Sequence, residues 1–329
     1  KEGSVMQAEL LGLGFVIAMA AASIRIATSL MYATLGEMIT ERSGILNLGI
    51  EGVMILGAMT AFITTYATHS LELGVLATIL AGLAEGVVMS FVYGRIGSNQ
   101  HVWGVAFTIA NFGLAYYIYR LYFGGTAGIM STIIPYSPVR IPLLADIPVL
   151  GPILFEQYAY TYVAIILFVI FAFVFKYTIW GLIITVVGDN PMAADTAGIN
   201  VYRTRYIAVT LGAIFMALGG SFLSIAQFNA FLFEIVAGRG WIAIALVTIG
   251  NWKPMRCLLA AILFGFIDAL QLRLQALGIS QFTLAGTAIT IPFQLFLALP
   301  YILTIVFLLM SSRTADYPTA LLTPYRREE

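Results

Sequence analysis

Long apolar runs are the feature that most constrains how this chain can fold. Several of them approach or exceed the roughly 20 residues that a helix needs to cross a bilayer. The runs cover residues 10–35, 44–68, 73–97, 102–123, 158–180, 206–227, 235–252, 255–277 and 289–310. Lipid offers no hydrogen-bond partners to the backbone, so such runs fold as helices. We therefore expect an all-α, polytopic membrane helical bundle of eight to ten spans, including broken or half helices, with the first run long enough for a span plus a half-helix.

The low charge content agrees with a membrane protein. Only 10% of the 329 residues are charged and 60% are hydrophobic, whereas soluble domains are about one quarter charged. The formal net charge is zero, so nothing favours nucleic acid as a partner. The first apolar run is too long for a removable signal peptide and ends without a cleavage pattern. We expect a single transmembrane domain over residues 1–329.

Basic residues predict the orientation of the bundle, because they gather on the cytoplasmic side of membrane proteins. Many of them fall in three segments that successive membrane crossings bring to the same side. These segments hold Arg203 and Arg205, Lys253 and Arg256, and Arg313, Arg326 and Arg327. This asymmetry places residues 187–206 and the C-terminus in the cytoplasm. The longest loop, residues 124–157, is then external.

The external loop contains five prolines, a density that forbids a long helix and suggests a stiff, extended cover. They are Pro135, Pro138, Pro142, Pro148 and Pro152. Such a surface could receive a soluble binding protein, or it could simply cap the bundle. The sequence leaves both readings open.

Residues 187–206 form a polar island between two apolar runs, with signals for a short helix. Asn190 can serve as N-cap, and Pro191 suits the first helical position because its missing N–H would be unpaired there. Gly198 is placed to end the helix in a left-handed conformation. These signals predict about two helical turns over residues 191–197.

The predicted short helix would expose Asp195 and align Met192, Thr196 and Ile199 along one side. A helix this short is marginal in water unless it docks on something. We therefore interpret it as a cytoplasmic segment that docks into a partner protein. The same pattern would also suit an ordinary capped loop between spans.

Polar residues are concentrated between residues 36 and 52, where Asn47 and Glu51 are spaced to share one helix face. Nearby glycines loosen the backbone, and a broken helix inside a membrane protein must be covered by protein or water. We expect this stretch near the centre of the assembly, lining or shaping a pathway. Alternatively, Glu51 is a buried clasp held by Arg25 or Arg42, and Arg25 itself needs an acidic partner in mid-segment.

Two further polar clusters permit similar alternatives. Asp268, Gln271 and Gln275 share a helix face, where they could line a polar passage or join helices by hydrogen bonds. Amide and charged groups also stand beside aromatic residues near the external ends of two spans: Gln227, Asn229, Glu234, Arg239, Phe228, Phe231, Phe233 and Trp241. That second cluster suits either a flat, hydrogen-bonding solute or an aromatic belt at the membrane interface.

Signatures of catalysis are missing from the sequence. No Gly-Lys-Ser/Thr occurs, so the chain has no P-loop with which to hold ATP. His69 and His101 lack metal-ligand spacing, and no nucleophile elbow is present. We expect no enzymatic activity and no cofactor in this chain.

With these segments laid out, the chain resembles the membrane permeases of prokaryotic ABC importers of the nucleoside class, relatives of the ribose and branched-chain amino-acid permeases. The resemblance covers nearly the whole chain in order. It is carried by residues 41–52, Asn99-Gln100, 187–201, 238–246, 268–275 and Thr323-Pro324-Tyr325. The chain departs from the family at Thr185, where an Arg is usual, and at Trp103, Phe107 and Thr108, which are bulkier and less polar than usual.

The resemblance implies a multi-pass protein of the prokaryotic plasma (inner) membrane with three kinds of partner. These are ABC ATPase subunits that bind ATP and Mg, a second and often different permease, and an extracytoplasmic lipoprotein or periplasmic binding protein. The coupling helix to the ATPase would involve Asp189, Asn190, Pro191, Met192, Asp195, Thr196, Gly198 and Ile199. The translocation path or central break would involve Asn47, Glu51, Trp103, Phe107, Asn111, Asn229 and Trp241.

The leading functional hypothesis is a permease subunit of an ATP-driven importer that carries nucleosides. Another neutral solute, such as a simple sugar or riboflavin, is the first alternative. An ion-driven secondary transporter is the second, although we find no inverted repeat with interrupted helices in matching positions. A structural scaffold would not require the buried charges of Arg25, Glu51 and Asp268.

Overall fold

The computed structural model describes residues 12–124, 132–276, 281–284, 287–290, 293–311 and 316–326. Arg313 and Arg327, which contribute to the orientation argument, lie outside these residues. Within the described part, seven helices are long and apolar enough to cross a membrane, and shorter apolar helices accompany them. The prediction of an all-helical membrane bundle is confirmed, and the chain is a multi-pass membrane protein.

Most helices begin and end within a few residues of the predicted segments, but the first ends at Arg42 and not at 35, the second begins at Ile50 and not at 44, and the helix over residues 179–189 was not predicted. The long ones are α2 (Leu13–Arg42), α3 (Ile50–Thr68), α4 (Leu71–Ser90) with its π-helical continuation η1 (Phe91–Ile96), α5 (Gln100–Phe123), α6 (Ala159–Tyr177), α9 (Val201–Phe222) with its continuation η3 (Leu223–Gln227), and α11 (Pro254–Ala276). The shorter ones are α7 (Ile179–Asp189), α8 (Pro191–Thr196), α10 (Arg239–Ile249) and α12 (Phe293–Ser311). The first apolar run, expected to hold a span plus a half-helix, is one helix of 30 residues from Leu13 onward.

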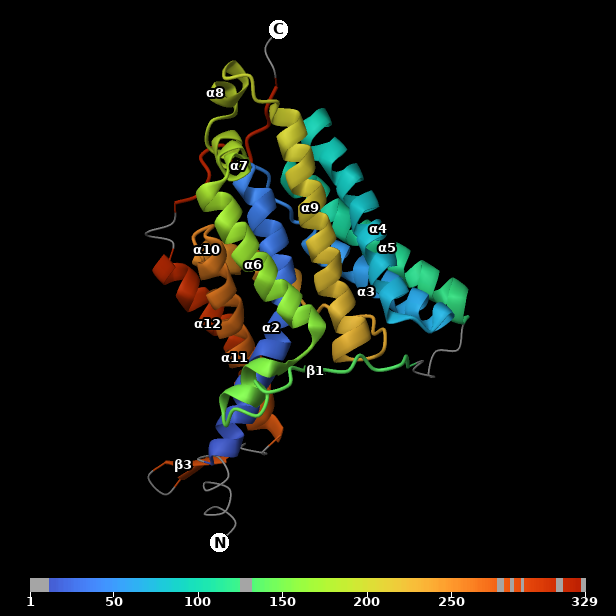
Figure 1. Cartoon of the computed structure of the whole chain (residues 1–329), viewed down its shortest axis with the longest axis vertical. Coiled ribbons are helices and arrows are strands. Elements are labelled where there is room, and N and C mark those ends of the chain that lie inside the picture. Colours follow the sequence, from blue (N-terminus) through green and yellow to red (C-terminus); the bar gives the residue numbers. More distant parts are fainter. Residues whose placement is uncertain are drawn as a thin grey trace.

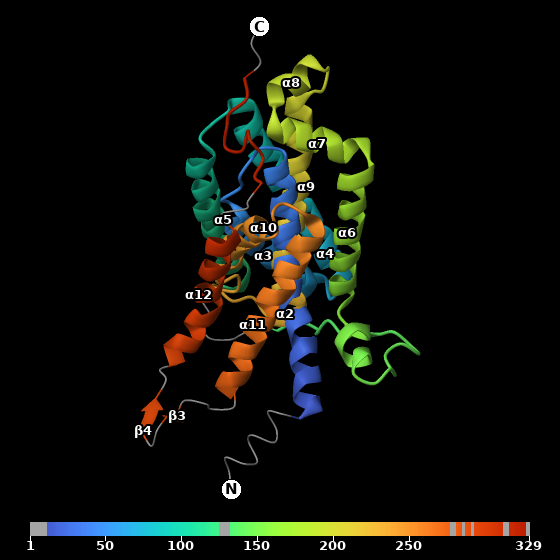
Figure 2. The ribbon, with the colours of Figure 1, turned by 90° about the vertical axis from the view of Figure 1, so that its left-hand side faces the viewer.

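Helix α9 lies at the centre of the bundle and packs against α2, α3 and α4 (Figure 1). Helix α2 packs against α9, and it also packs against α10 and α11, which in turn contact α12. Helices α5 and α6 lie on opposite sides of this core (Figure 2). Most of α5 is exposed; of its buried positions, Asn111 faces Gly52 of α3 and Gly104 faces Leu48, just before α3 begins.

Glycines allow the central helices to approach closely, because residues without a bulky side chain let helix backbones meet. A Cβ at Gly86 would meet the backbone of Thr210, and one at Gly82 would meet that of Ile214, so α4 lies directly on α9. Gly220 of α9 likewise lies against the carbonyl of Met54 in α3. Backbone-to-backbone contact therefore fixes the positions of α3, α4 and α9.

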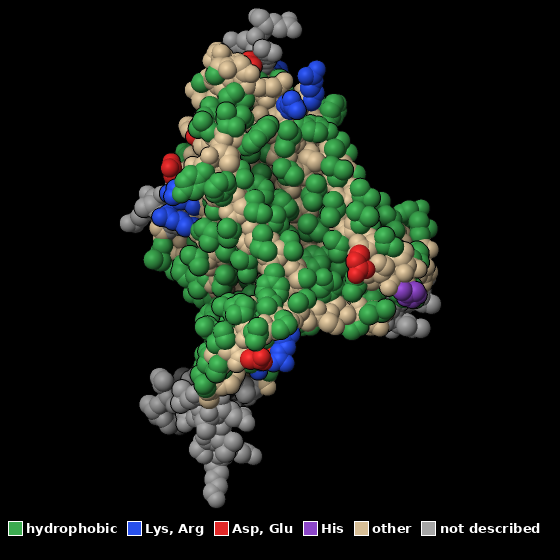
Figure 3. All heavy atoms as spheres, in the orientation of Figure 1, with side chains coloured by type: hydrophobic (Ala, Val, Ile, Leu, Met, Phe, Trp, Pro, Cys, Tyr) green, Lys and Arg blue, Asp and Glu red, His purple; other side chains and the backbone are tan. Residues whose placement is uncertain are grey.

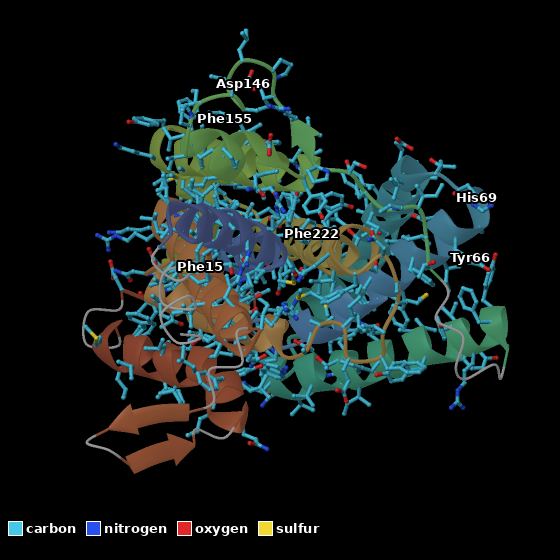
Figure 4. The ribbon with its side chains drawn as sticks, turned by 90° about the horizontal axis from the view of Figure 1, so that it is seen from below. Phe15, Tyr66, His69, Asp146, Phe155 and Phe222 are labelled. Atoms are coloured by element: carbon cyan, nitrogen blue, oxygen red, sulfur yellow. The ribbon has the colours of Figure 1, made fainter. Side chains whose placement is uncertain are left out.

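The loop before α6 contains no long helix in residues 132–157, as its prolines predicted. Strands β1 (Val139–Arg140) and β2 (Glu156–Gln157) pair antiparallel, and the π-helical turn η2 (Gly151–Phe155) precedes β2. Figure 4 shows Asp146 and Phe155 of this loop on one side of the end face and Tyr66 and His69 of the α3–α4 turn on another. A second hairpin, β3 (Gln281–Leu284) with β4 (Thr287–Thr290), was not predicted.

Helix α8 and the C-terminal residues lie at the same end of the bundle (Figure 1). Hydrophobic side chains spread over the middle of the face in Figure 3, with few charged ones among them. This distribution suits a surface in contact with lipid. That the α8 end faces the cytoplasm remains a prediction from the basic residues.

Filling the α3–α9 contact should destabilise the bundle. We expect Gly220→Ala to lower the free energy of unfolding by about 1–3 kcal/mol, because the new methyl group would overlap the Met54 carbonyl oxygen. Gly14→Ala is the matched control, since a Cβ at Gly14 meets nothing within 4 Å. Thermal unfolding of the two variants in detergent measures the difference, and equal midpoints would contradict the close contact.

Candidate functional site

The non-helical link between α2 and α3, residues 43–49, is buried; its first residues donate to backbone carbonyls of α2, and its later residues to side chains. The Asn47 N–H donates to Oε1 of Glu37 at 2.9 Å, and the Leu46 N–H donates to Oε1 of Gln100 at 2.8 Å. Oδ1 of Asn47 accepts from the Gly49 N–H at 2.9 Å and from the Tyr93 hydroxyl at 3.3 Å. The predicted break in the helix is therefore confirmed as an ordered link, but the expectation that Asn47 and Glu51 share one helix face was wrong, because Asn47 lies in the link and Glu51 in α3.

Asn47 has no exposed surface, and its side-chain oxygen is used in the hydrogen bonds that hold this link. It is better described as a clasp than as a lining residue of an open path. The hydroxyl of Thr108 adds a further bond, donating to the Leu48 carbonyl at 3.1 Å and so joining the link to α5. The link is thus tied to α2, α4 and α5 together.

Glu51, in the first turn of α3, holds the beginning of α10. Its Oε1 accepts from the Gly238 N–H at 2.7 Å and its Oε2 from the Gly240 N–H at 2.8 Å. A carboxylate is favourable at a helix N-terminus, where backbone N–H groups are otherwise unpaired. Gly240 must remain without a side chain, because its Cβ would meet Glu51. Glu51 therefore fixes the half-helix α10 to α3.

The expectation that Arg25 or Arg42 holds Glu51 was wrong. Arg25 donates to Oε1 of Gln157 at 3.3 Å and to the Glu156 carbonyl at 3.1 Å, so its partners are amide and carbonyl oxygens of the loop before α6. Arg42 lies over the ring of Phe175, 4.5 Å from its centroid. Both arginines point away from Glu51 because α2 presents them on other sides of the bundle.

The remaining path candidates divide into buried and exposed groups. Asn111 is buried and donates to Oε1 of Glu85 at 2.9 Å, while Phe107 is half-buried against Tyr93. Trp103 is 40% exposed, Trp241 is 44% exposed, and Asn229 is half-buried. Trp103 and Trp241 are thus the candidates that present most surface to a solute or a partner. Their role in a path remains a prediction.

Next to this region, aromatic side chains of α5 and of the segment before α10 enclose a hollow of about 520 Å³. Phe233 packs edge-on against Tyr116, with ring centroids 4.6 Å apart, and the Tyr116 hydroxyl donates to the Phe233 carbonyl at 2.8 Å. The hollow is lined by Gly113, Tyr116, Tyr117, Arg120 and Phe233. The aromatic cluster predicted around residues 227–241 therefore extends onto α5.

The short helix predicted over residues 191–197 exists as α8. Oδ1 of Asn190 accepts from the Ala193 N–H at 3.0 Å, Pro191 occupies the first turn, and Gly198 has φ +83°. All three punctuation signals are confirmed, and the helix ends at Thr196, one residue before the predicted end. Asp195, expected to be exposed, is half-buried because it lies on the side of α8 toward the bundle.

Helix α8 rests on the bundle by one side and is open on the other. Ala194 packs with Val187, Val201 and Tyr325 in a small apolar cluster. Met192 is 49% exposed and Thr196 is exposed, so the open side carries two of the three residues predicted to line up there. The third, Ile199, packs partly against the cluster. The open side is available for a partner.

The C-terminal tail, residues 316–326, connects α8 to the α2–α3 link. The Ala320 N–H donates to the Gly188 carbonyl at 2.9 Å, and the rings of Tyr325 and Tyr202 lie 5.4 Å apart. Buried Arg205 donates through Nε to the Ser43 carbonyl at 3.1 Å and through Nη1 to the Thr323 carbonyl at 3.4 Å. The tail, the start of α9 and the link thus form one hydrogen-bonded unit.

Sequence reasoning missed several of these residues. It used Arg205 only to argue orientation, although a charge at the edge of an apolar run also signals a buried partner. It passed over Glu85, a lone acid inside an apolar run, which pairs with Asn111. It also missed Trp252, whose indole N–H donates to buried Glu41.

Comparison with known proteins agrees with this architecture. The family model described as branched-chain amino acid transport system / permease component matches residues 18–309. A guanosine ABC transporter permease protein of Bacillus subtilis is 36% identical, covering 92% of this chain and 95% of its own. A nucleoside ABC transporter permease protein of Lactococcus lactis is 29% identical over 89% of this chain and 92% of its own.

A third relative carries a different substrate name. A Haloferax volcanii protein provisionally assigned as a glucose ABC transporter permease is 35% identical, covering 96% of this chain and 99% of its own. No solved structure matches the chain significantly.

Replacing the Glu51 carboxylate should loosen α10. In Glu51→Gln one oxygen is replaced by an amide NH₂ that cannot accept from the backbone N–H it faces, so one buried donor is left unpaired. We expect unfolding to become easier by about 1–3 kcal/mol. Glu72→Gln, on an exposed carboxylate, should leave the thermal midpoint in detergent unchanged; a similar loss in both variants would argue against the clasp.

Proposed function

Because this chain belongs to the branched-chain amino acid transport system permease family and is an ABC transporter permease, we propose that it is a nucleoside-carrying subunit of an ATP-driven importer. Such permeases in general work with ATPase and substrate-binding partners. In this proposal a separate ATPase holds ATP and Mg, a second permease completes the path, and an extracytoplasmic binding protein delivers the solute.

The observation that carries the coupling part of the proposal is the open side of α8. It projects from the end of the bundle (Figure 1), with Met192 and Thr196 exposed on it. The opposite side is packed on the bundle through Ala194. A short helix that is capped, anchored on one side and open on the other can transmit a push from a docked protein without deforming. This supports the cytoplasmic coupling role.

Movement of α8 would reach the α2–α3 link through the C-terminal tail. Gly188 lies just before α8 and bonds the tail, while Arg205 bonds both the tail and the link. From the link, Glu51 continues to α10. We propose that a displacement of α8 shifts this connected unit and changes which side of the bundle is open. In such a scheme the equilibrium between the inward-open and outward-open states shifts because the docked ATPase makes different contacts with each state.

A flat aromatic solute suits the exposed face of α5 and the start of α10. Stacking on aromatic side chains recognises any flat base, at roughly 1–3 kcal/mol per base. Phe233, Tyr117 and Trp241 offer exposed rings there, and Arg120 supplies hydrogen-bond donors. The guanosine-named and nucleoside-named relatives support the same substrate class. Sugars also stack on aromatic rings, and the glucose-named relative makes a sugar the second candidate.

The coupling proposal predicts that a charge introduced on the open side of α8 stops ATP-driven transport of the solute. We expect Met192→Glu, in the complex reconstituted with its ATPase, second permease and binding protein, to abolish most solute uptake because it disturbs an apolar contact with the ATPase. Met255→Glu is the matched control, since Met255 is 44% exposed and begins α11. Uptake of labelled guanosine by proteoliposomes is the measurement.

Equal uptake by the Met192→Glu and Met255→Glu complexes would contradict the coupling role. Uptake by the lone purified chain in an ion gradient, without nucleotide, would instead favour the secondary transporter.

The substrate proposal predicts a dependence on Phe233. We expect Phe233→Ala to raise the half-saturating guanosine concentration roughly ten-fold by removing a stacking surface. Phe173→Ala, which removes a 58% exposed ring from α6, should change nothing. In the same assay excess unlabelled guanosine, and not glucose, should compete with labelled guanosine. Competition by glucose and not by guanosine would contradict the nucleoside assignment and indicate that the substrate is a sugar.

A further inference from the structure

A second hollow, of about 360 Å³, lies where the π-helical continuation of α4 and the beginning of α9 meet. This volume falls in the range of small-molecule sites. Gly94 leaves it open, because a Cβ built there meets nothing within 4 Å. Its polar lining comes from Arg95, Asn200, Tyr202, Arg203 and Tyr206.

The two arginines of this hollow are available to a ligand. Arg95 and Arg203 are both exposed, and within the described ranges the ion pairs of arginine involve Arg140 and Arg239 instead. The Arg95 guanidinium carbon lies 5.8 Å from the ring centroid of Tyr202, while the backbone N–H of Arg203 donates to Oδ1 of Asn200 and so fixes the first turn of α9 that carries the Arg203 side chain. Two guanidinium groups that line one hollow favour a phosphate, which they can contact bidentately.

The hollow also lies at the level where a bilayer surface is expected. Arg95 is in the last turn of the span Leu71–Ile96, and Arg203 is in the first turn of the span Val201–Gln227. Phe91, which lines the hollow, is 54% exposed, and neighbouring Ile207 is 40% exposed. Figure 3 shows basic side chains at the end where α9 begins, above a surface covered by hydrophobic side chains. Charge and apolar surface thus adjoin each other.

We propose that this hollow binds the headgroup of an anionic phospholipid, with its phosphate between Arg95 and Arg203 and its acyl chains along the apolar surface of α4 and α9. A soluble phosphate would use the guanidinium groups but not the adjoining apolar surface. Basic pockets between spans at a membrane surface bind anionic lipids through this combination of charge and burial. The proposal does not depend on the transported substrate or on the coupling role of α8.

Retention of phosphatidylglycerol by the purified full chain tests the proposal. Native mass spectrometry over a titration with phosphatidylglycerol or phosphatidylcholine gives the apparent affinity for each lipid. We expect the wild-type chain to prefer phosphatidylglycerol, and the double variant Arg95→Gln/Arg203→Gln to bind it roughly ten- to thirty-fold more weakly. Gly94→Phe, which keeps both charges but fills the hollow, should weaken the same binding.

The matched control is Lys253→Gln/Arg256→Gln, which also removes two exposed positive charges next to the start of a span. It should leave the phosphatidylglycerol affinity unchanged. Equal loss in both double variants would show bulk charge attraction and overturn the site, as would full binding by Gly94→Phe. Displacement of the lipid by millimolar inorganic phosphate would show a site for a soluble anion and overturn the lipid assignment.

Discussion

Buried backbone that is not helical must find its hydrogen-bond partners within the protein, and this requirement organises the centre of the bundle. Between α2 and α3 the chain leaves the helix, and Glu37, Asn47 and Gln100 supply the bonds that a helix would have supplied. These side chains come from α2, from the link itself and from α5. A break that could have been a weak point is therefore tied to its neighbours.

The same requirement applies at the beginning of α10, which starts inside the protein. Glu51 satisfies two backbone N–H groups there, so the two interruptions of helical structure support each other. On the other side, Arg205 joins the link to the C-terminal tail, which in turn bonds Gly188 beside α8. Polar contacts thus join Gly188, just before α8, through the tail to the α2–α3 link, and Glu51, just beyond the link in the chain, bonds the start of α10. In our proposal, this connection carries force from the ATPase to the path.

Helices and their ends could largely be predicted from the sequence, whereas hydrogen-bond partners that are distant in the sequence could not. Apolar runs predicted most of the helices, although not α7, the end of α2 or the beginning of α3, and Asn190, Pro191 and Gly198 predicted α8, because each signal acts over a few residues. The acid at Glu51 was recognised as needing a partner. Its partners are backbone amides 187 and 189 positions away, which carry no side-chain signature. The pairing of Arg25 with Gln157 and the path of the C-terminal tail were hidden for the same reason.

The central claim is that α8 lies at the cytoplasmic face and contacts an ATPase. Labelling of the cysteine thiol in a Met192→Cys variant tests this claim most directly. The natural Cys257 is buried, so a membrane-impermeant maleimide would report on the new cysteine alone. We expect no labelling in intact cells, labelling in inside-out vesicles stripped of the ATPase, and protection when the ATPase is added back. Labelling from the outside of intact cells, or identical labelling with and without the ATPase, would contradict the account.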